Sequence, residues 1–301
     1  MTDSGDLSTI GAALAEATDR LRRTGSPTPR LDAEVMIAHV MGTERSWLLA
    51  HPEAPLAQRA NLESALERRA GGEPIAYIRG FKEWHSLRIR TDARSLIPRP
   101  ETELLADAAM AEIADRLERN RNRNREPVVA WEVATGSGAI AVALAIRFRA
   151  AIENGHLVLA ATDASADALG LASENLVGHG VADLVAVVLA DLLEPAGEAL
   201  PRPDVVVANL PYVASAEVDA RQGSLGYEPR IALDGGPDGL VLLRRLLAEL
   251  PVRAAAGATV LLEIGVGQAE AVSVLAPAGA SVSVVPDLAG LDRIVRVEMP
   301  D

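Results

Sequence analysis

The stretch Glu132-Val-Ala-Thr-Gly-Ser-Gly138 joins a strand-like apolar segment (128–133) to an apolar segment with helical character (138–149). Glycines allow a backbone to approach a ligand closely, and the first turn of a helix presents free N–H groups. The same short sequence also forms tight turns that bind nothing. The stretch therefore predicts a strand–turn–helix unit of an α/β fold, and its ligand has to be inferred from the residues around it.

Strand-like and helical segments alternate from Pro127 to the end of the chain. The predicted strands cover 128–133, 157–162, 182–189, 204–208, 258–264, 281–285 and 294–298, and the predicted helices cover 138–149, 166–177, 240–250 and 268–276. Such alternation indicates βαβ units and a largely parallel sheet. Ligands of such sheets bind beyond the carboxyl ends of the strands, near the point where the strand order reverses.

The first 75 residues or so have a different character. Ala- and Leu-rich segments with helical period predict three helices over 7–23, 31–41 and 56–70, which form a small bundle. Segments 75–80 and 87–91 are rich in β-forming residues and predict a hairpin, and a helix is expected over 104–117. We therefore expect a helical domain (1–73), a hairpin connector (74–98) and an α/β domain (99–301). The basic run 118–126 predicts a solvated loop, with an RNA-contacting loop as the alternative.

Composition limits the possible functions of the 301 residues. The formal net charge of −13 argues against a general nucleic-acid backbone binder, and the absence of cysteine excludes disulfides and thiolate metal sites. The five histidines are scattered without ligand spacing, so no metal site is expected. The first six residues lack a signal-peptide pattern, and no apolar run reaches the ~18 residues that span a membrane. We expect a soluble, cytoplasmic monomer.

Three predicted strands each end in a polar side chain. Asp163 suits acceptance of both hydroxyls of a ribose, and Asp191 suits acceptance from an adenine amino group, although either acid alone is typical of a helix cap. Asn209 ends the fourth strand. Polar groups that converge at the switch point of a sheet mark a pocket, so we expect a shared ligand site.

A dinucleotide such as NAD is the natural competitor for this site. Its fingerprint, G-x-G-x-x-G, needs a third small residue, and Ala141 stands there. No residue suited to hydride chemistry stands out, however, and the residues after the fourth strand have no evident task beside a nicotinamide.

Those residues are Asn209-Leu-Pro-Tyr212, directly after the apolar run 204–208. The Asn209 side chain and the Leu210 carbonyl supply two acceptors, Pro211 restrains Leu210, and Tyr212 offers a face for stacking. This combination suits a planar, weakly nucleophilic NH2 group. A plain strand-end turn is the alternative, since Asn and Pro are common in turns.

With these motifs together, the chain resembles class I S-adenosylmethionine-dependent methyltransferases, and more narrowly the HemK-like N5-glutamine methyltransferases of peptide chain release factors. The resemblance covers nearly the whole chain. It rests on Leu96-Ile-Pro-Arg-Pro-Glu-Thr-Glu103, Ala134-Thr-Gly-Ser-Gly-Ala-Ile-Ala141, Asn209-Leu-Pro-Tyr212, Tyr227-Glu-Pro-Arg-Ile-Ala-Leu-Asp-Gly-Gly-Pro-Asp-Gly239 and Leu261-Leu-Glu-Ile-Gly265.

The resemblance implies a Rossmann-like methyltransferase sheet and transfer of a methyl group from S-adenosylmethionine to the glutamine N5 of a Gly-Gly-Gln motif. It implies that release factors are the protein partner, that the helical domain recognises the body of the substrate, and that no metal is needed. The cofactor residues it implies are Ala134, Thr135, Gly136, Ser137, Gly138, Asp163, Asp191, Leu192 and Asn209. The catalytic and substrate-binding residues it implies are Asn209, Leu210, Pro211 and Tyr212. Three further residues line the pocket mouth or, alternatively, belong to a capped linker that enters a helix: Arg99, Glu101 and Thr102.

Two residues depart from the family pattern. The family usually has Gly where this chain has Ala134, and Pro where it has Leu210. A methyl group at 134 is acceptable if φ is negative there. Leu210 keeps the carbonyl that the chemistry uses, so activity should survive both changes.

Three other functions remain open on the residues alone. One is a glutamine methyltransferase of a ribosomal protein, which the motifs separate poorly from a release factor enzyme. Another is a methyltransferase of adenine or guanine amino groups that flips its target base, against which the net charge stands. The third is a non-catalytic cofactor-binding protein, against which the intact Asp163, Asn209 and Tyr212 stand.

Overall fold

The computed structural model describes residues 9–121, 126–195, 197, 199–221 and 223–301. The chain divides into two compact units, each with its own core. The first comprises the chain as far as Phe81 together with the segment ending at Tyr227, and the second comprises Lys82–Arg221 and Glu228–Asp301. The division falls within the segment expected as a connector (74–98), and the first unit includes a segment from far along the chain.

The first unit is a helical bundle. Its helices are α1 (Ile10–Arg23), α2 (Pro29–Met41), α3 (Arg45–Ala50), α4 (Arg59–Ala70) and α5 (Ile75–Arg79). Thr9 caps α1 by accepting a hydrogen bond from the Ala12 N–H, and Gly42 ends α2 with a φ of 65°. Apolar side chains from α1 to α5 form one buried core, which explains the helical period of this part of the sequence.

The prediction of a strand over residues 75–80 is wrong, because residues 75–79 form the short helix α5. Pro74 precedes its first turn, and Gly80 ends it with a φ of 75°. Two consecutive side chains, Tyr77 and Ile78, are buried, which suits a helix rather than the alternation of a strand.

The hairpin lies directly after α5 and consists of β1 (Phe81–Trp84) and β2 (Leu87–Arg90). Its two turn residues, His85 and Ser86, both have positive φ, as a type I′ turn requires. Neither residue is a usual choice at such positions, so the local sequence carries no clear signal for this turn. Trp84 and Ile89 are buried in the core of the second unit.

The second unit contains the predicted sheet. Its seven strands have the order β5-β4-β3-β6-β7-β9-β8. The first five along the chain are parallel, and β9 runs antiparallel to both of its neighbours. The strands are β3 (Val128–Val133), β4 (Leu157–Asp163), β5 (Ala186–Leu189), β6 (Val205–Ala208), β7 (Thr259–Glu263), β8 (Ser281–Pro286) and β9 (Asp292–Glu298). The expected α/β class is confirmed, except that residues 182–184 form a 3-10 turn rather than strand.

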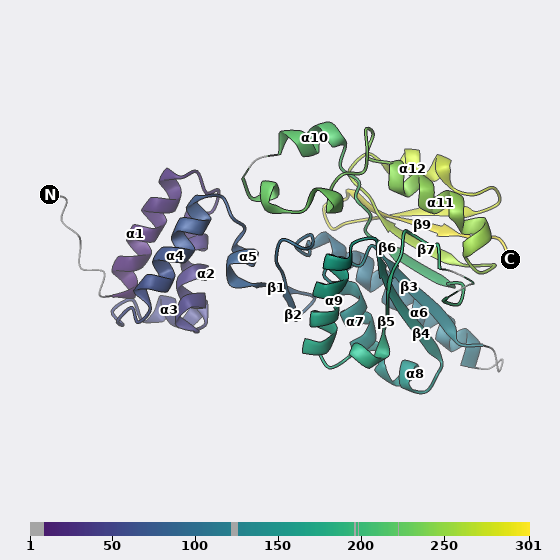
Figure 1. Cartoon of the computed structure of the whole chain (residues 1–301), viewed down its shortest axis with the longest axis horizontal. Helices are drawn as coiled ribbons and strands as arrows, with labels where there is room; N and C mark the ends of the chain where they lie inside the picture. Colours follow the sequence, from purple (N-terminus) through teal and green to yellow (C-terminus); the bar gives the residue numbers. More distant parts are fainter. Residues whose placement is uncertain (1–8, 122–125, 196, 198, 222) are drawn as a thin grey trace. The chain divides into compact units, whose positions relative to one another are not determined.

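Helices cover both faces of this sheet (Figure 1). Helices α6 (Glu101–Arg121), α7 (Ala139–Arg147) and α9 (Ala166–Gly178) contribute to the core on one face, and α11 (Val241–Arg253) and α12 (Ala269–Leu275) pack on the other. Both faces need apolar side chains, which explains why β6 has four consecutive buried residues. Short helices α8 (Arg149–Glu153) and α10 (Ser215–Ala220) complete the unit.

The predicted loop at 118–126 is partly helix, because α6 continues to Arg121. Residues 122–125 of that run lie outside the described residues. Among the described helices, none combines the length and the apolar character that crossing a bilayer requires.

The sheet brings the predicted site residues to one edge. Strand β3 lies between β4 and β6, so the strand order reverses there. In the register, Val133 lies opposite both Thr162 and Ala208, and Ala208 lies opposite Leu262. Residues that follow these four strands therefore leave the sheet at the same level, where a ligand is expected.

Candidate active site

A cavity of about 1000 Å³, open to solvent, lies at this edge of the sheet. The predicted site residues on its wall are Ala134, Thr135, Gly136, Ser137, Asp163, Asp191, Leu192, Asn209, Leu210, Pro211, Arg99 and Thr102. Gly138, Glu101 and Tyr212 are predicted site residues that lie outside this wall. Most of the predicted site is thus assembled around one cavity, from four strand ends.

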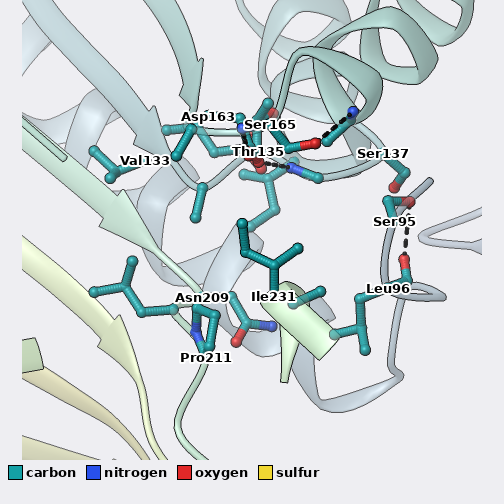
Figure 2. Close-up of a pocket in the computed structure, with 18 of the residues that line it drawn as sticks. Ser95, Leu96, Val133, Thr135, Ser137, Asp163, Ser165, Asn209, Pro211 and Ile231 are labelled. Carbon is teal, nitrogen blue, oxygen red and sulfur yellow. Dashed lines mark hydrogen bonds between the residues drawn. The ribbon is translucent and has the colours of Figure 1, made fainter. Parts of the chain in front are cut away.

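Asp163 enters the cavity from the end of β4 (Figure 2). One carboxylate oxygen accepts a hydrogen bond from the Gly136 N–H and the other accepts one from the Ser165 N–H, both at 2.9 Å. These bonds hold the carboxylate in a fixed orientation. Burial raises the pKa of Asp163 above its usual value, against the effect of the backbone donors. The site therefore offers an oriented carboxylate that a pair of ligand hydroxyls could still approach, because each oxygen has a second lone pair.

The turn between β3 and α7 does not have the negative φ that an alanine at position 134 was expected to need. Ala134 has a φ of 59°, so the negative φ that would make its methyl group acceptable is not present. The left-handed region costs a residue with a Cβ about 1–2 kcal/mol. This cost explains why the family usually has glycine at the position.

Replacing Ala134 by glycine should raise the free energy of unfolding by roughly 1 kcal/mol, because glycine adopts positive φ without strain. Urea unfolding followed by circular dichroism measures the change. The matched control is Ala164→Gly, at the neighbouring strand end, where φ is not positive; this change should lower stability. A loss of stability in both variants would contradict strain at Ala134.

Gly138 has a packing role rather than a place on the cavity wall. It begins α7 with a φ of 76°, and a Cβ at this position would lie 2.9 Å from the Cβ of Ala172 in α9. Real Cβ contacts are longer, so any larger residue would force the two helices apart. The glycine is explained by the close approach of α7 and α9.

Glu132 is a site residue that the sequence interpretation missed. It is buried in β3, and its Oε2 accepts hydrogen bonds from the Thr135 hydroxyl at 2.7 Å and the Ala141 N–H at 2.8 Å. The carboxyl group therefore ties the turn to the first turn of α7. Burial raises the pKa of Glu132 to about 8. An acid inside an otherwise apolar strand was the available signal.

This pKa predicts a pH-dependent stability. The folded protein keeps a proton on Glu132 that the unfolded chain releases near its ordinary value of 4.5, so the stabilisation is present below that pH and is lost as pH rises towards about 8. Glu132→Gln retains an acceptor oxygen but has no proton to lose. We expect the difference in unfolding free energy between wild type and variant to change over this pH window, measured by urea unfolding. Parallel pH profiles would contradict a titrating Glu132.

Asp191 and Leu192 follow β5 on the opposite side of Asp163 from Asn209. Leu192 is buried with a φ of 51°, and Asp191 is partly exposed. The Asp191 carboxylate already pairs with the Arg245 guanidinium at 2.8 Å, so one of its oxygens is engaged. A bond from an adenine amino group to this carboxylate remains a prediction.

Asn209 leaves the end of β6 with a defined amide orientation. Its Nδ2 donates a hydrogen bond to the Thr102 Oγ1 at 3.1 Å. The Thr102 hydroxyl also interacts with the Glu263 carboxyl group and lowers its pKa, against the effect of burial. Because its Nδ2 is engaged with Thr102, the Asn209 Oδ1 is the amide atom that is left to accept from a ligand. Figure 2 shows the Asn209 side chain at the cavity beside Ile231.

The Tyr212 side chain lies beyond the cavity wall and is held on several sides. Its hydroxyl donates to the Glu263 Oε1 at 3.3 Å, and burial raises its pKa to about 12. Its backbone carbonyl accepts from the Gln268 Nε2 at 3.0 Å. The Tyr212 ring is thus fixed by the end of β7, and its backbone is fixed by the loop that follows this strand.

The glycine-rich stretch 233–239 packs on the backbone of Asn209–Tyr212. A Cβ at Gly235 would lie 2.6 Å from the Pro211 carbonyl oxygen, and a Cβ at Gly239 would lie 2.3 Å from that of Tyr212. Neither distance is possible for a real Cβ. Glycine is therefore required at both positions for the stretch to fit against the two carbonyls. This requirement explains why the glycine-rich stretch accompanies Asn-x-Pro-Tyr.

Arg99 and Glu101, both expected at the cavity mouth, have different positions in the structure. Arg99 lies on the wall, where its guanidinium pairs with the buried Glu228 carboxylate at 2.6 Å. The other Glu228 oxygen accepts from the Ile97 N–H at 3.1 Å, so Glu228 holds the segment before α6. Glu101 is exposed in the first turn of α6. The structure therefore gives Arg99 a place at the site and Glu101 a place in the helix start.

Comparison with known proteins decides the family. Residues 12–80 match the model of the PrmC N-terminal domain. The chain is 35% identical to the release factor glutamine methyltransferase of Deinococcus radiodurans, over 94% of this chain and 96% of that protein. It is 37% identical to that of Moorella thermoacetica, over 95% and 96% of the two chains. The chain belongs to the release factor glutamine methyltransferase family.

Membership in the release factor glutamine methyltransferase family confirms the resemblance and, with it, S-adenosylmethionine as the cofactor. The cavity fits this molecule. The oriented Asp163 carboxylate suits ribose hydroxyls, the turn 134–137 brings backbone close to the ligand, and apolar side chains such as Leu192 and Ile140 line the wall.

Proposed function

We propose that this protein transfers the methyl group of S-adenosylmethionine to the side-chain amide nitrogen (N5) of the glutamine in the Gly-Gly-Gln motif of peptide chain release factors, acting in the cytoplasm as a monomer. One observation carries the proposal. The Asn209 amide, held by Thr102, leaves its Oδ1 as an acceptor at the same cavity that contains the Asp163 carboxylate. An acceptor for an NH2 group therefore lies beside a site suited to a ribose.

When bound, S-adenosylmethionine supplies a methyl group that is already activated by its positively charged sulfur. The protein has to orient the acceptor nitrogen, since an amide lone pair is delocalised and weakly nucleophilic. The Asn209 Oδ1 and the Leu210 carbonyl would accept the two N–H bonds of the glutamine, which favours positive charge as it develops on that nitrogen. Orientation of two bound reactants corresponds to effective molarities of up to ~10⁵–10⁸ M.

Leu210 is compatible with this function. It lies on the cavity wall and is buried, and its carbonyl is a backbone group that any residue supplies. Proline at a compatible position adds about 0.4–1 kcal/mol of stability through chain entropy. The family's usual proline therefore adds rigidity, and leucine keeps the chemistry.

Transfer of a radiolabelled methyl group tests the substrate directly. Intact release factor, a Gly-Gly-Gln peptide, a ribosomal protein and DNA are offered separately with labelled S-adenosylmethionine. We expect label on intact release factor, less on the peptide because the helical unit recognises the body of the substrate, and none on a release factor whose motif glutamine is replaced by alanine. Preferred labelling of the ribosomal protein or of DNA would overturn the assignment. The DNA result also tests whether DNA is a methyl acceptor.

A further inference from the structure

Glu263 is a buried carboxylate for which the sequence indicated no function. It ends β7 within Leu261-Leu-Glu-Ile-Gly265 and is 2% exposed. Because Ala208 lies opposite Leu262 in the sheet, Glu263 leaves its strand beside Asn209. Burial of a carboxylate costs free energy unless hydrogen bonds compensate it, so the partners of this group are informative.

The two side chains that interact with the Glu263 carboxyl group both belong to the amide-binding part of the site. The Tyr212 hydroxyl donates to the Glu263 Oε1 at 3.3 Å, and the Thr102 hydroxyl is close enough to lower the pKa of the carboxyl group. Thr102 in turn accepts from the Asn209 Nδ2 at 3.1 Å. Within the described part of the chain, the other carboxylate oxygen, Oε2, has no hydrogen-bond partner.

We propose that Glu263 is a positioning residue for methyl transfer, which orients the Tyr212 ring through its hydroxyl and the Asn209 amide through Thr102. The inference rests on the proposed function. Without the carboxylate, the Thr102 hydroxyl could donate to Asn209 instead of accepting from it. The Asn209 amide could then turn over and present its NH2 group, a donor, to the NH2 group of the substrate.

The backbone of this region is held by other groups. The Tyr212 carbonyl is bound by Gln268, and the stretch 233–239 packs on the Pro211 and Tyr212 carbonyls. Strand β6 is paired with β3 and β7 on either side of it. Loss of Glu263 should therefore change side-chain orientation at the site and leave the loop in place.

Two substitutions of Glu263 separate positioning from packing. Gln keeps an acceptor oxygen for both hydroxyls and places its NH2 group at the position of the unpartnered Oε2, whereas Leu has a similar volume and no acceptor. We expect E263Q to keep kcat within about threefold of wild type. We expect E263L to lose kcat on the order of 10²-fold, the usual effect of a misplaced reacting group. The Kd for S-adenosylmethionine, measured by calorimetry, should stay within about twofold in both, since no wall residue has changed.

Single removal of each partner gives an independent test should E263L fail to fold. T102V removes the hydroxyl that lies between Asn209 and Glu263, and Y212F releases the Tyr212 ring, so each should lower kcat by about tenfold. Cofactor affinity should be unchanged in Y212F, because Tyr212 lies outside the cavity wall. The loss of kcat in the double variant T102V/E263L should be much smaller than the product of the two single losses, because both changes act on the same amide.

The outcomes distinguish this inference from the proposed function. A wild-type protein that labels no release factor overturns both. A labelled release factor together with an E263L kcat near wild type, or with wild-type rates for both T102V and Y212F, overturns only the role of Glu263. Equal loss of kcat in E263Q and E263L would also overturn it, because Gln retains the acceptor.

Discussion

Asn209→Ala should lower the rate of methyl transfer on the order of 10²–10³-fold, the usual effect of deleting one oriented polar group that stabilises charge in the transition state. The variant retains the Leu210 carbonyl but loses the Oδ1 acceptor that Thr102 orients. S-Adenosylmethionine should still bind within a few-fold of wild-type affinity, because Asp163 and the turn 134–137 are unchanged.

Single-turnover labelling of release factor at saturating cofactor measures the rate, and calorimetry measures the affinity. Leu210→Pro is the matched control. It alters the next residue and preserves its carbonyl, so it should retain near wild-type activity. Equal losses of rate and cofactor affinity in Asn209→Ala would show that Asn209 serves the cofactor rather than the amide.

Asp163→Ala should have the opposite effect to Asn209→Ala, because it should cause a large loss of cofactor affinity. Hydrogen bonds to charged groups contribute about 1.5–3 kcal/mol each. Removal of a carboxylate that accepts two ribose hydroxyls should therefore raise the Kd for S-adenosylmethionine on the order of 10²-fold or more. Rate at saturating cofactor should fall much less, since Asn209 and Leu210 remain.

The control for Asp163→Ala is Asp167→Ala, which removes an exposed carboxylate from the first turn of α9, outside the cavity wall. Its Kd should equal that of wild type. The wild-type Kd should also rise as pH falls through the raised pKa of Asp163, because a protonated carboxyl group loses acceptors for the hydroxyls. A Kd that is unchanged in Asp163→Ala would remove this residue from the cofactor site.

Much of the second unit was predictable from local patterns. Apolar runs such as 204–208 predicted buried parallel strands, and three of the runs were followed by a polar residue that the structure places on the cavity wall: Asp163, Asp191 and Asn209. These features are local, because side-chain period and the residue after a strand do not depend on what lies far along the chain. The helix at 75–79 was missed because five residues are too few for period to separate helix from strand.

The sequence by itself determined the α/β sheet, its cofactor edge, and the residues Asp163 and Asn209 that point to methyl transfer. Only the tertiary structure decided the positive φ of Ala134, the packing role of Gly138, and the joining of Glu263, Thr102 and Asn209. Residues 102, 209 and 263 are far apart along the chain and meet because β6 and β7 pair and α6 packs across them. Local propensity contains no information on such meetings, since the sign of a φ and the partner of a buried group follow from packing.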